Sequence, residues 1–151
     1  MFDLTTYLPY LLNRAGFAAS AAFAEALAEL DLTVPAWRVL AVLLHDGRVR
    51  VGELAERTSI EFSTLSRLID ALQRRGLVAR KPAKDDARAV HVSLTARGRA
   101  IAQRLLPAAV ALEGRMIAGM SAAEVRNLRR LLDRLYENMR GEEAAQRSAS
   151  A

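Results

Sequence analysis

Apolar residues recur every three or four positions along residues 4–30, and many of these positions hold alanine. This spacing predicts a long amphipathic helix. The helix should begin near Thr6, because Pro9 is tolerated only in the first turn. A helix of roughly 24 residues spans ~36 Å. That is longer than such a small domain needs for its own core, and the alanines permit close approach of another helix.

Three shorter helices are predicted next. Thr33 and Pro35 fit the N-cap and the first turn of one that ends before Asp46. A short helix follows over residues 51–57. A third covers residues 63–75, and the glycine that follows it stops the helix.

The hydrophobic period changes after this third helix, from helical spacing to alternation. Residues 77–80 predict a short strand, residues 81–88 a turn that contains Pro82, and residues 90–94 a second strand. Together the two strands form a hairpin with basic residues near its tip.

Two long helices complete the pattern. Thr95 caps the first, which should kink at Pro107. Ser121 and Glu124 form a capping box at the start of the second. Residues 141–151 are small and polar and are predicted to be disordered.

The predicted fold is mainly α with a small β-hairpin wing. The order helix, helix, helix and hairpin is typical of a winged helix-turn-helix. In that fold the second helix of the motif enters the major groove of DNA. The candidate residues on this helix, here called the recognition face, are Ser63, Thr64, Ser66 and Arg67.

The residue types of the recognition face suit contacts to DNA. Serine and threonine hydroxyls can contact bases or phosphates, and an arginine can bind guanine with two hydrogen bonds. Two alternatives remain open: Ser63 acts only as the N-cap of the helix, and Arg67 pairs with Asp70 three positions later.

Basic residues are concentrated in the middle of the chain. The net charge is +5, and residues 46–104 hold thirteen Lys and Arg against seven Asp and Glu, while the rest holds nine against ten. Arginine-favouring codons would explain why 20 of the 22 basic residues are arginine, but not this segregation. The pattern indicates an anionic partner for the centre. Five basic residues of this central region are candidates for contacts with DNA phosphates: Arg74, Arg75, Arg80, Lys81 and Lys84. About half of them should contact phosphates, and the others should be solvated.

Several classes of protein are excluded by composition. The 151 residues include no cysteine, which excludes disulfides, thiolate zinc sites and thiol-based peroxide sensing. His45 and His91 lie far apart in the sequence, so no metal or cofactor is expected. The sequence contains neither a nucleophile–base constellation nor a phosphate-binding glycine loop, so an enzyme is not expected either. Uncharged stretches reach only ten residues, and no signal peptide begins the chain. We therefore expect a soluble cytoplasmic protein without a membrane partner.

Three motifs resemble one family. Residues 86–98 read Asp-x-Arg-x-x-x-Val-x-Leu-Thr-x-x-Gly, residues 63–78 read Ser-x-Leu-x-Arg-x-x-x-x-Leu-x-x-x-Gly-Leu-Val, and residues 32–40 read Leu-Thr-x-Pro-x-Trp-Arg-Val-Leu. In combination they are similar to the MarR family of bacterial regulators, over roughly residues 5–140. The resemblance implies a transcriptional regulator, most often a repressor.

The resemblance also implies a homodimer. Residues 1–31 and 105–140 would form the dimerisation helices of a single domain, residues 1–140, and residues 32–104 the DNA-binding lobe. Two recognition helices would then meet successive major grooves of a palindromic operator in double-stranded DNA. The family's wing arginine, which enters the minor groove, corresponds to Arg88, and Asp86 corresponds to the residue that orients it.

A small-molecule effector is the last property that the resemblance implies. Such effectors are often aromatic anions bound between the dimerisation helices and the winged lobe, where they change the separation of the two recognition helices. The candidate wall is Tyr7, Tyr10, Arg14, Phe17, Trp37, Arg38 and His45.

Arg14 is the only basic residue in the first 37 positions and would face either an effector carboxylate or an acid of the protein itself. As alternatives to binding an effector, Trp37 would be part of the hydrophobic core and His45 would contact carbonyl groups at the end of its helix. We expect an aromatic carboxylate or an aromatic acyl-CoA. A competing hypothesis is a helical protein–protein adaptor whose basic centre is incidental.

Overall fold

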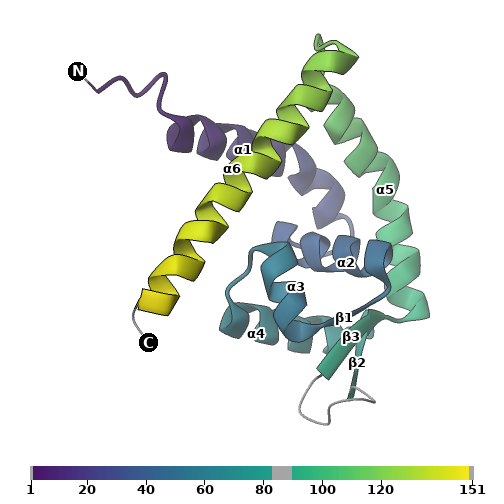
Figure 1. Ribbon diagram of the computed structural model, residues 1–151. Coiled ribbons are helices and arrows are strands. Elements are labelled where there is room, and N and C mark those ends of the chain that lie inside the picture. Colours follow the sequence, from purple (N-terminus) through teal and green to yellow (C-terminus); the bar gives the residue numbers. More distant parts are fainter. Residues whose placement is uncertain (1, 83–89, 150–151) are drawn as a thin grey trace. The chain divides into compact units, whose positions relative to one another are not determined.

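The structure is a computed structural model that describes residues 2–82 and 90–149. The predicted first helix is α1, Leu8–Ala28, and Pro9 lies in its first turn as expected (Figure 1). Only the C-terminal part of α1 enters the core, through Phe23 and Leu27. The first turns of α1 are exposed, in agreement with a helix longer than its own lobe requires.

A helix-turn-helix follows, made of α2 (Val34–Asp46), α3 (Val51–Thr58) and α4 (Phe62–Arg74). The Thr33 side chain accepts a hydrogen bond from the third residue after it at 3.3 Å, which confirms the predicted N-cap of α2. α3 ends at Ser59, whose φ of 51° lies in the left-handed region and turns the chain towards α4. The expected helices are therefore present, with boundaries that differ by one or two residues.

The wing belongs to a sheet of three strands rather than two. β2 (Val78–Pro82) and β3 (Val90–Leu94) form the predicted antiparallel hairpin, and β1 (Arg48–Arg50) pairs with the other edge of β3. The strand β1 was missed because three residues are too few to display alternation. It forms because the buried Val49 lies opposite Val92.

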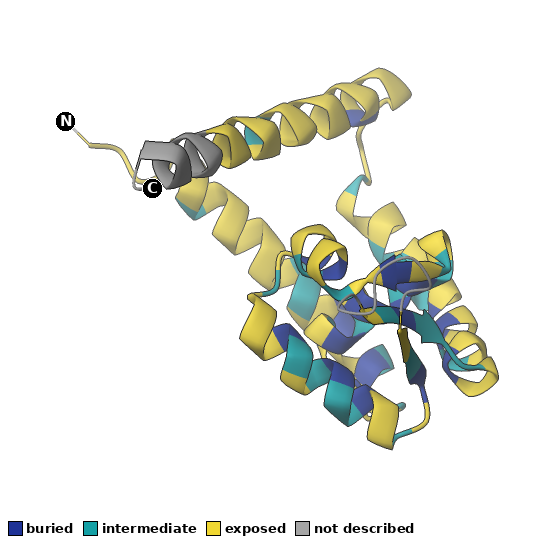
Figure 2. Cartoon of the chain, turned by 60° about the horizontal axis from the view of Figure 1, so that its bottom comes forward, coloured by how far each residue is buried: buried dark blue, intermediate teal, exposed yellow. Residues whose placement is uncertain are grey.

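One hydrophobic core holds α1 to α4, the sheet and the start of α5 together. The largest fully buried side chains come from each of these elements except α5. They are Leu27, Val39, Leu40, Leu43, Leu54, Leu65, Ile69, Leu72, Leu77, Val78 and Val92. Figure 2 shows the buried positions concentrated in this lobe.

The chain divides into two compact units, Met1–Leu112 and Glu113–Ala151. Helix α5 covers Ala96–Met116 and contains Pro107, and α6 covers Ala122–Ala149. The Ser121–Glu124 capping box is present, with hydrogen bonds of 2.7 and 3.3 Å. The expected disorder from position 141 differs from the structure, in which α6 continues to Ala149. The alanine and glutamate that follow position 141 are strong helix formers, so the helix can extend there.

Thr95 and Gly98 fasten the start of α5 to the end of α4. The Thr95 N–H donates to the Leu77 carbonyl at 3.1 Å, and the Thr95 hydroxyl donates to the Gly76 carbonyl at 2.7 Å. The same hydroxyl accepts from the Gly98 N–H at 3.0 Å and so caps α5, as predicted. A Cβ atom at Gly98 would lie only 1.8 Å from the Leu77 carbonyl oxygen. Threonine and glycine therefore stand in the Leu-Thr-x-x-Gly motif because the backbones approach so closely.

Candidate nucleic-acid interface

Helix α4 has a buried face and an exposed face, as expected of a recognition helix. Leu65, Ile69 and Leu72 fill the core with 2% exposure or less. On the other side Ser63, Thr64 and Arg67 are exposed and Ser66 is half-buried. The four residues of the recognition face thus share the N-terminal half of one helix, and the core fixes the orientation of that helix.

Glu61, which was not among the residues predicted for the site, caps α4. Its carboxylate accepts hydrogen bonds from the backbone N–H groups of Ser63 and Thr64, both at 2.9 Å, and from the Ser63 hydroxyl. The Ser63 hydroxyl bond, followed by the two backbone bonds, lowers the pKa of the Glu61 carboxyl to about 2. The alternative that Ser63 is the N-cap is therefore wrong. Glutamate is an uncommon N-cap, so the usual capping signal did not point to it.

Asp70 pairs with the wing and not with Arg67. Its carboxylate accepts a hydrogen bond from the Arg80 guanidinium, which also donates to the Ser66 carbonyl at 3.2 Å. No ion pair joins Arg67 to Asp70 in the part of the chain that the structure describes. Arg80 therefore ties strand β2 to the middle of α4 and is engaged within the protein.

The basic residues expected at phosphates separate into two groups. Arg74 and Lys81 are exposed. Arg75 instead donates to the carbonyls of Leu30 at 2.9 Å and Asp31 at 2.5 Å. These bonds join the end of α4 to the end of α1 and give Arg75 a structural role. The remaining wing candidates Lys84, Asp86 and Arg88 lie outside the described residues.

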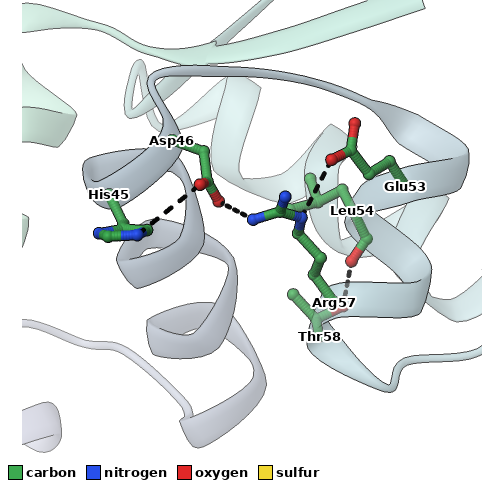
Figure 3. Close-up of polar contacts among 6 residues, drawn as sticks. All are labelled: His45, Asp46, Glu53, Leu54, Arg57 and Thr58. Carbon is green, nitrogen blue, oxygen red and sulfur yellow. Dashed lines mark hydrogen bonds and ion pairs between the residues drawn. The ribbon is translucent and has the colours of Figure 1, made fainter.

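A second ion-pair cluster joins α2 to α3 (Figure 3). The Arg57 guanidinium lies 2.6 Å from the carboxylate of Asp46 and 3.0 Å from that of Glu53. In the same helix, the buried Thr58 hydroxyl donates to the Leu54 carbonyl at 2.7 Å. These bonds fix the short helix α3, which supports α4.

The candidate effector residues of α1 lie on its exposed N-terminal half. The Arg14 guanidinium carbon lies 5.3 Å from the centre of the Tyr10 ring, a cation–π contact. Arg14 and Phe17 line a surface hollow of about 560 Å³. Tyr7 contacts the Phe2 ring, with 5.2 Å between their centroids.

The candidates on α2 have other contacts. Trp37 packs edge-on against Phe23 at 5.7 Å and borders the core, in favour of its core alternative. Arg38 donates to the Thr58 carbonyl at 3.3 Å. His45 is exposed and lies 3.9 Å from the Asp46 carboxylate (Figure 3). Among the described residues, no hydrogen bond, ion pair or ring contact joins these three side chains to the candidates on α1.

Among the side chains that the structure describes, those of residues 2–82 and 90–141, no cluster of three or more His, Cys, Asp or Glu is suited to hold a metal ion. In the same described ranges, no helix is both long and apolar enough to cross a membrane. The hydroxyl and guanidinium groups of the recognition face, held on a rigid helix, can hydrogen-bond to bases and phosphates.

Comparisons with known proteins agree with this arrangement. A family model described as the MarR family matches residues 30–89. An HTH-type transcriptional repressor of Mycobacterium tuberculosis is 32% identical over 128 residues, which cover 85% of this chain and 92% of the repressor.

Solved structures are similar over most of the chain. A MarR mutant from E. coli, in complex with operator DNA, superposes with a TM-score of 0.75 and 29% identity, over 85% of this chain and 92% of the other. Bordetella bronchiseptica BpsR, from a structure on the regulation of its DNA binding by 6-hydroxynicotinic acid, gives a TM-score of 0.75 and 28% identity, over 85% and 97% of the two chains. The identity to the mycobacterial repressor, its coverage and the shared fold together establish that this chain belongs to the MarR family of transcriptional regulators.

Proposed function

We propose that the protein is a homodimeric repressor that binds a palindromic operator in double-stranded DNA through α4. The observation that carries the proposal is the recognition face: Ser63, Thr64 and Arg67 are exposed on a helix that the buried Leu65, Ile69 and Leu72 anchor in the core. The similar E. coli protein was solved in complex with operator DNA, which supports DNA binding by this chain. Arg88, with Asp86, is proposed as the minor-groove residue of the wing, and Arg74, Lys81 and Lys84 as phosphate contacts.

An exposed apolar stripe on α6 supports the homodimer. Much of α6 is exposed (Figure 2), and within the second unit apolar residues at helical spacing are each about two-fifths exposed or more. They are Leu128, Leu131, Leu132, Tyr136 and Met139. A helix with such a stripe requires a partner surface to remove it from water. A second copy of the chain provides that surface, in agreement with the dimer that the family resemblance implies.

We further propose that a small aromatic anion, an aromatic carboxylate or an aromatic acyl-CoA, releases the DNA. Arg14 supplies a cation beside an aromatic ring, and Phe17 next to it is 76% exposed. BpsR supports the ligand class, since its DNA binding is regulated by 6-hydroxynicotinic acid, an aromatic carboxylic acid. In this proposal, Arg14 pairs with the carboxylate of the effector.

The first test is selection of binding sites from a randomised duplex pool at near-physiological salt. We expect a palindrome with half-sites about one helical turn, or ten base pairs, apart. Arg67→Ala should cost ~1–3 kcal/mol on that site and less on random DNA. An equal loss on both would reassign Arg67 to a phosphate, and absence of any enriched sequence would favour the adaptor hypothesis.

The effector proposal is tested on the selected operator. Aromatic acids and their CoA thioesters should weaken DNA binding by the wild type, and Arg14→Gln should reduce this response while DNA binding without effector is retained. Unchanged DNA affinity across the panel of compounds would contradict the proposal.

A further inference from the structure

Phe62 is the exception to the amphipathic pattern of α4. The apolar residues Leu65 and Ile69 are fully buried, whereas the Phe62 side chain is 57% exposed. It stands in the first turn of α4, directly before Ser63 and one turn before Ser66. An exposed aromatic ring therefore adjoins the recognition face.

Phe62 lies in a groove of about 580 Å³ that several elements of the first unit form. Val51 from α3 and Val90 from β3 contribute apolar walls, and Ser66 belongs to the same lining. Arg50 and Arg80 also line the groove, Arg80 being paired with Asp70. The ring is thus presented at an apolar surface with cationic neighbours, rather than covered by them.

The position of the groove determines which partner fits it. Ser66 of the recognition face lines the groove, and the hydroxyls of Ser63 and Thr64 on the same helix suit the base edges of the major groove. On those edges the C5-methyl group of thymine is the apolar feature that a phenyl ring can contact.

We propose that Phe62 is a specificity-determining residue that contacts a thymine methyl group in each half-site of the operator. The inference rests on the proposed function, in which α4 enters the major groove. Phe62 would add an apolar contact with a base to the hydrogen bonds that the recognition face can form with bases. Phe62 was not predicted as a site residue, because the helix was expected to begin one position later, at residue 63.

The test replaces each thymine of the selected operator by deoxyuridine, which removes only the methyl group. At one of these thymine positions, the substitution should weaken DNA binding by the wild-type protein about fourfold for each half-site changed. The reason is that burial of one methyl group is worth about 0.8 kcal/mol. Phe62→Ala should bind the thymine and deoxyuridine duplexes equally. Phe62→Leu should keep most of the discrimination, because it keeps an apolar side chain.

Phe2→Ala is the matched control, since Phe2 is also largely exposed but lies outside α4. This variant should discriminate thymine from deoxyuridine as the wild type does. Thermal unfolding of Phe62→Ala should resemble that of the wild type, because the removed ring is mostly solvent-exposed.

Three results would overturn the inference: no effect of deoxyuridine at any position, the same effect in Phe62→Ala as in the wild type, or selected half-sites that contain no thymine. In each of these cases sequence-specific binding survives, and the proposed function stands. If the protein selects no sequence at all, the proposed function and this inference fail together. A loss of the response to aromatic acids in Phe62→Ala, with intact discrimination of thymine, would assign the groove to a small ligand instead.

Discussion

Gly98→Ala should destabilise the protein more than any ordinary surface substitution. The Cβ atom of an alanine at this position would lie 1.8 Å from the oxygen and 2.8 Å from the carbon of the Leu77 carbonyl. A Cβ atom makes ordinary van der Waals contacts only from 3.4 Å, so α5 and the start of the wing would have to separate by about 1.6 Å. Both obstructing atoms belong to the backbone, and no rotation of a side chain can relieve the contact.

The magnitude follows from what this separation disrupts. Overpacking in a filled interior costs ~1–3 kcal/mol. The movement also weakens the bonds of Thr95 to the Leu77 and Gly76 carbonyls, at ~1 kcal/mol each. We therefore expect a loss of about 3–5 kcal/mol in the free energy of unfolding, a large part of the ~5–15 kcal/mol of a typical domain.

The assay is urea unfolding followed by circular dichroism. Both proteins are compared at one protomer concentration, because the apparent stability of a dimer depends on it. Gly52→Ala is the control: this glycine is also helical, and nothing lies within 4 Å of the place that a Cβ atom would take there, so stability should be unchanged or slightly higher. A loss below ~1 kcal/mol for Gly98→Ala would refute this reasoning, since a backbone contact this close cannot be relieved so cheaply.

The remaining predictions concern the supports of the recognition helix. Asp70→Asn removes a negative charge from the DNA-binding lobe, so charge alone predicts tighter DNA binding. Because Asp70 holds Arg80, we instead expect binding up to about fivefold weaker in a fluorescence titration, and tighter binding would contradict the positioning role. Glu61→Gln should be less stable than the wild type at neutral pH. The folded-state pKa of Glu61 lies below its usual value, because the capping bonds favour the charged carboxylate. The difference in urea midpoint between the wild type and Glu61→Gln should therefore shrink as the pH falls from about 4.5 towards 2. A difference that stays constant with pH would exclude the capping role. Thr58→Val removes a buried hydroxyl that donates to Leu54 and should cost ~1 kcal/mol in unfolding free energy, an unchanged value counting against the bond.

Local signals predicted most of the helices and both strands of the wing. The caps at Thr33 and at Ser121 with Glu124, together with the change of period after α4, act over about four residues or fewer. Such signals can be recognised in the sequence because all the groups involved are close neighbours along the chain. The recognition face was predicted for the same reason, since helical spacing alone separates it from the buried Leu65 and Ile69.

Interactions between distant segments had to come from the tertiary structure. Strand β1 exists because Val49 meets Val92, and Arg75 turns away from solvent because the carbonyls of Leu30 and Asp31 lie beside it. Asp70 had a basic neighbour at the correct helical spacing, yet it pairs with Arg80 on a strand.

The sequence by itself determined the features that depend on near neighbours along the chain, and packing decided those that depend on distant segments. Periodicity and caps specified the winged helix-turn-helix and the helix that carries the recognition face. Packing decided which charged side chains remain exposed for DNA, because a guanidinium pairs with whichever acceptor the fold brings near it. It also explains Gly98, whose lack of a side chain is required by a carbonyl 21 positions earlier in the chain.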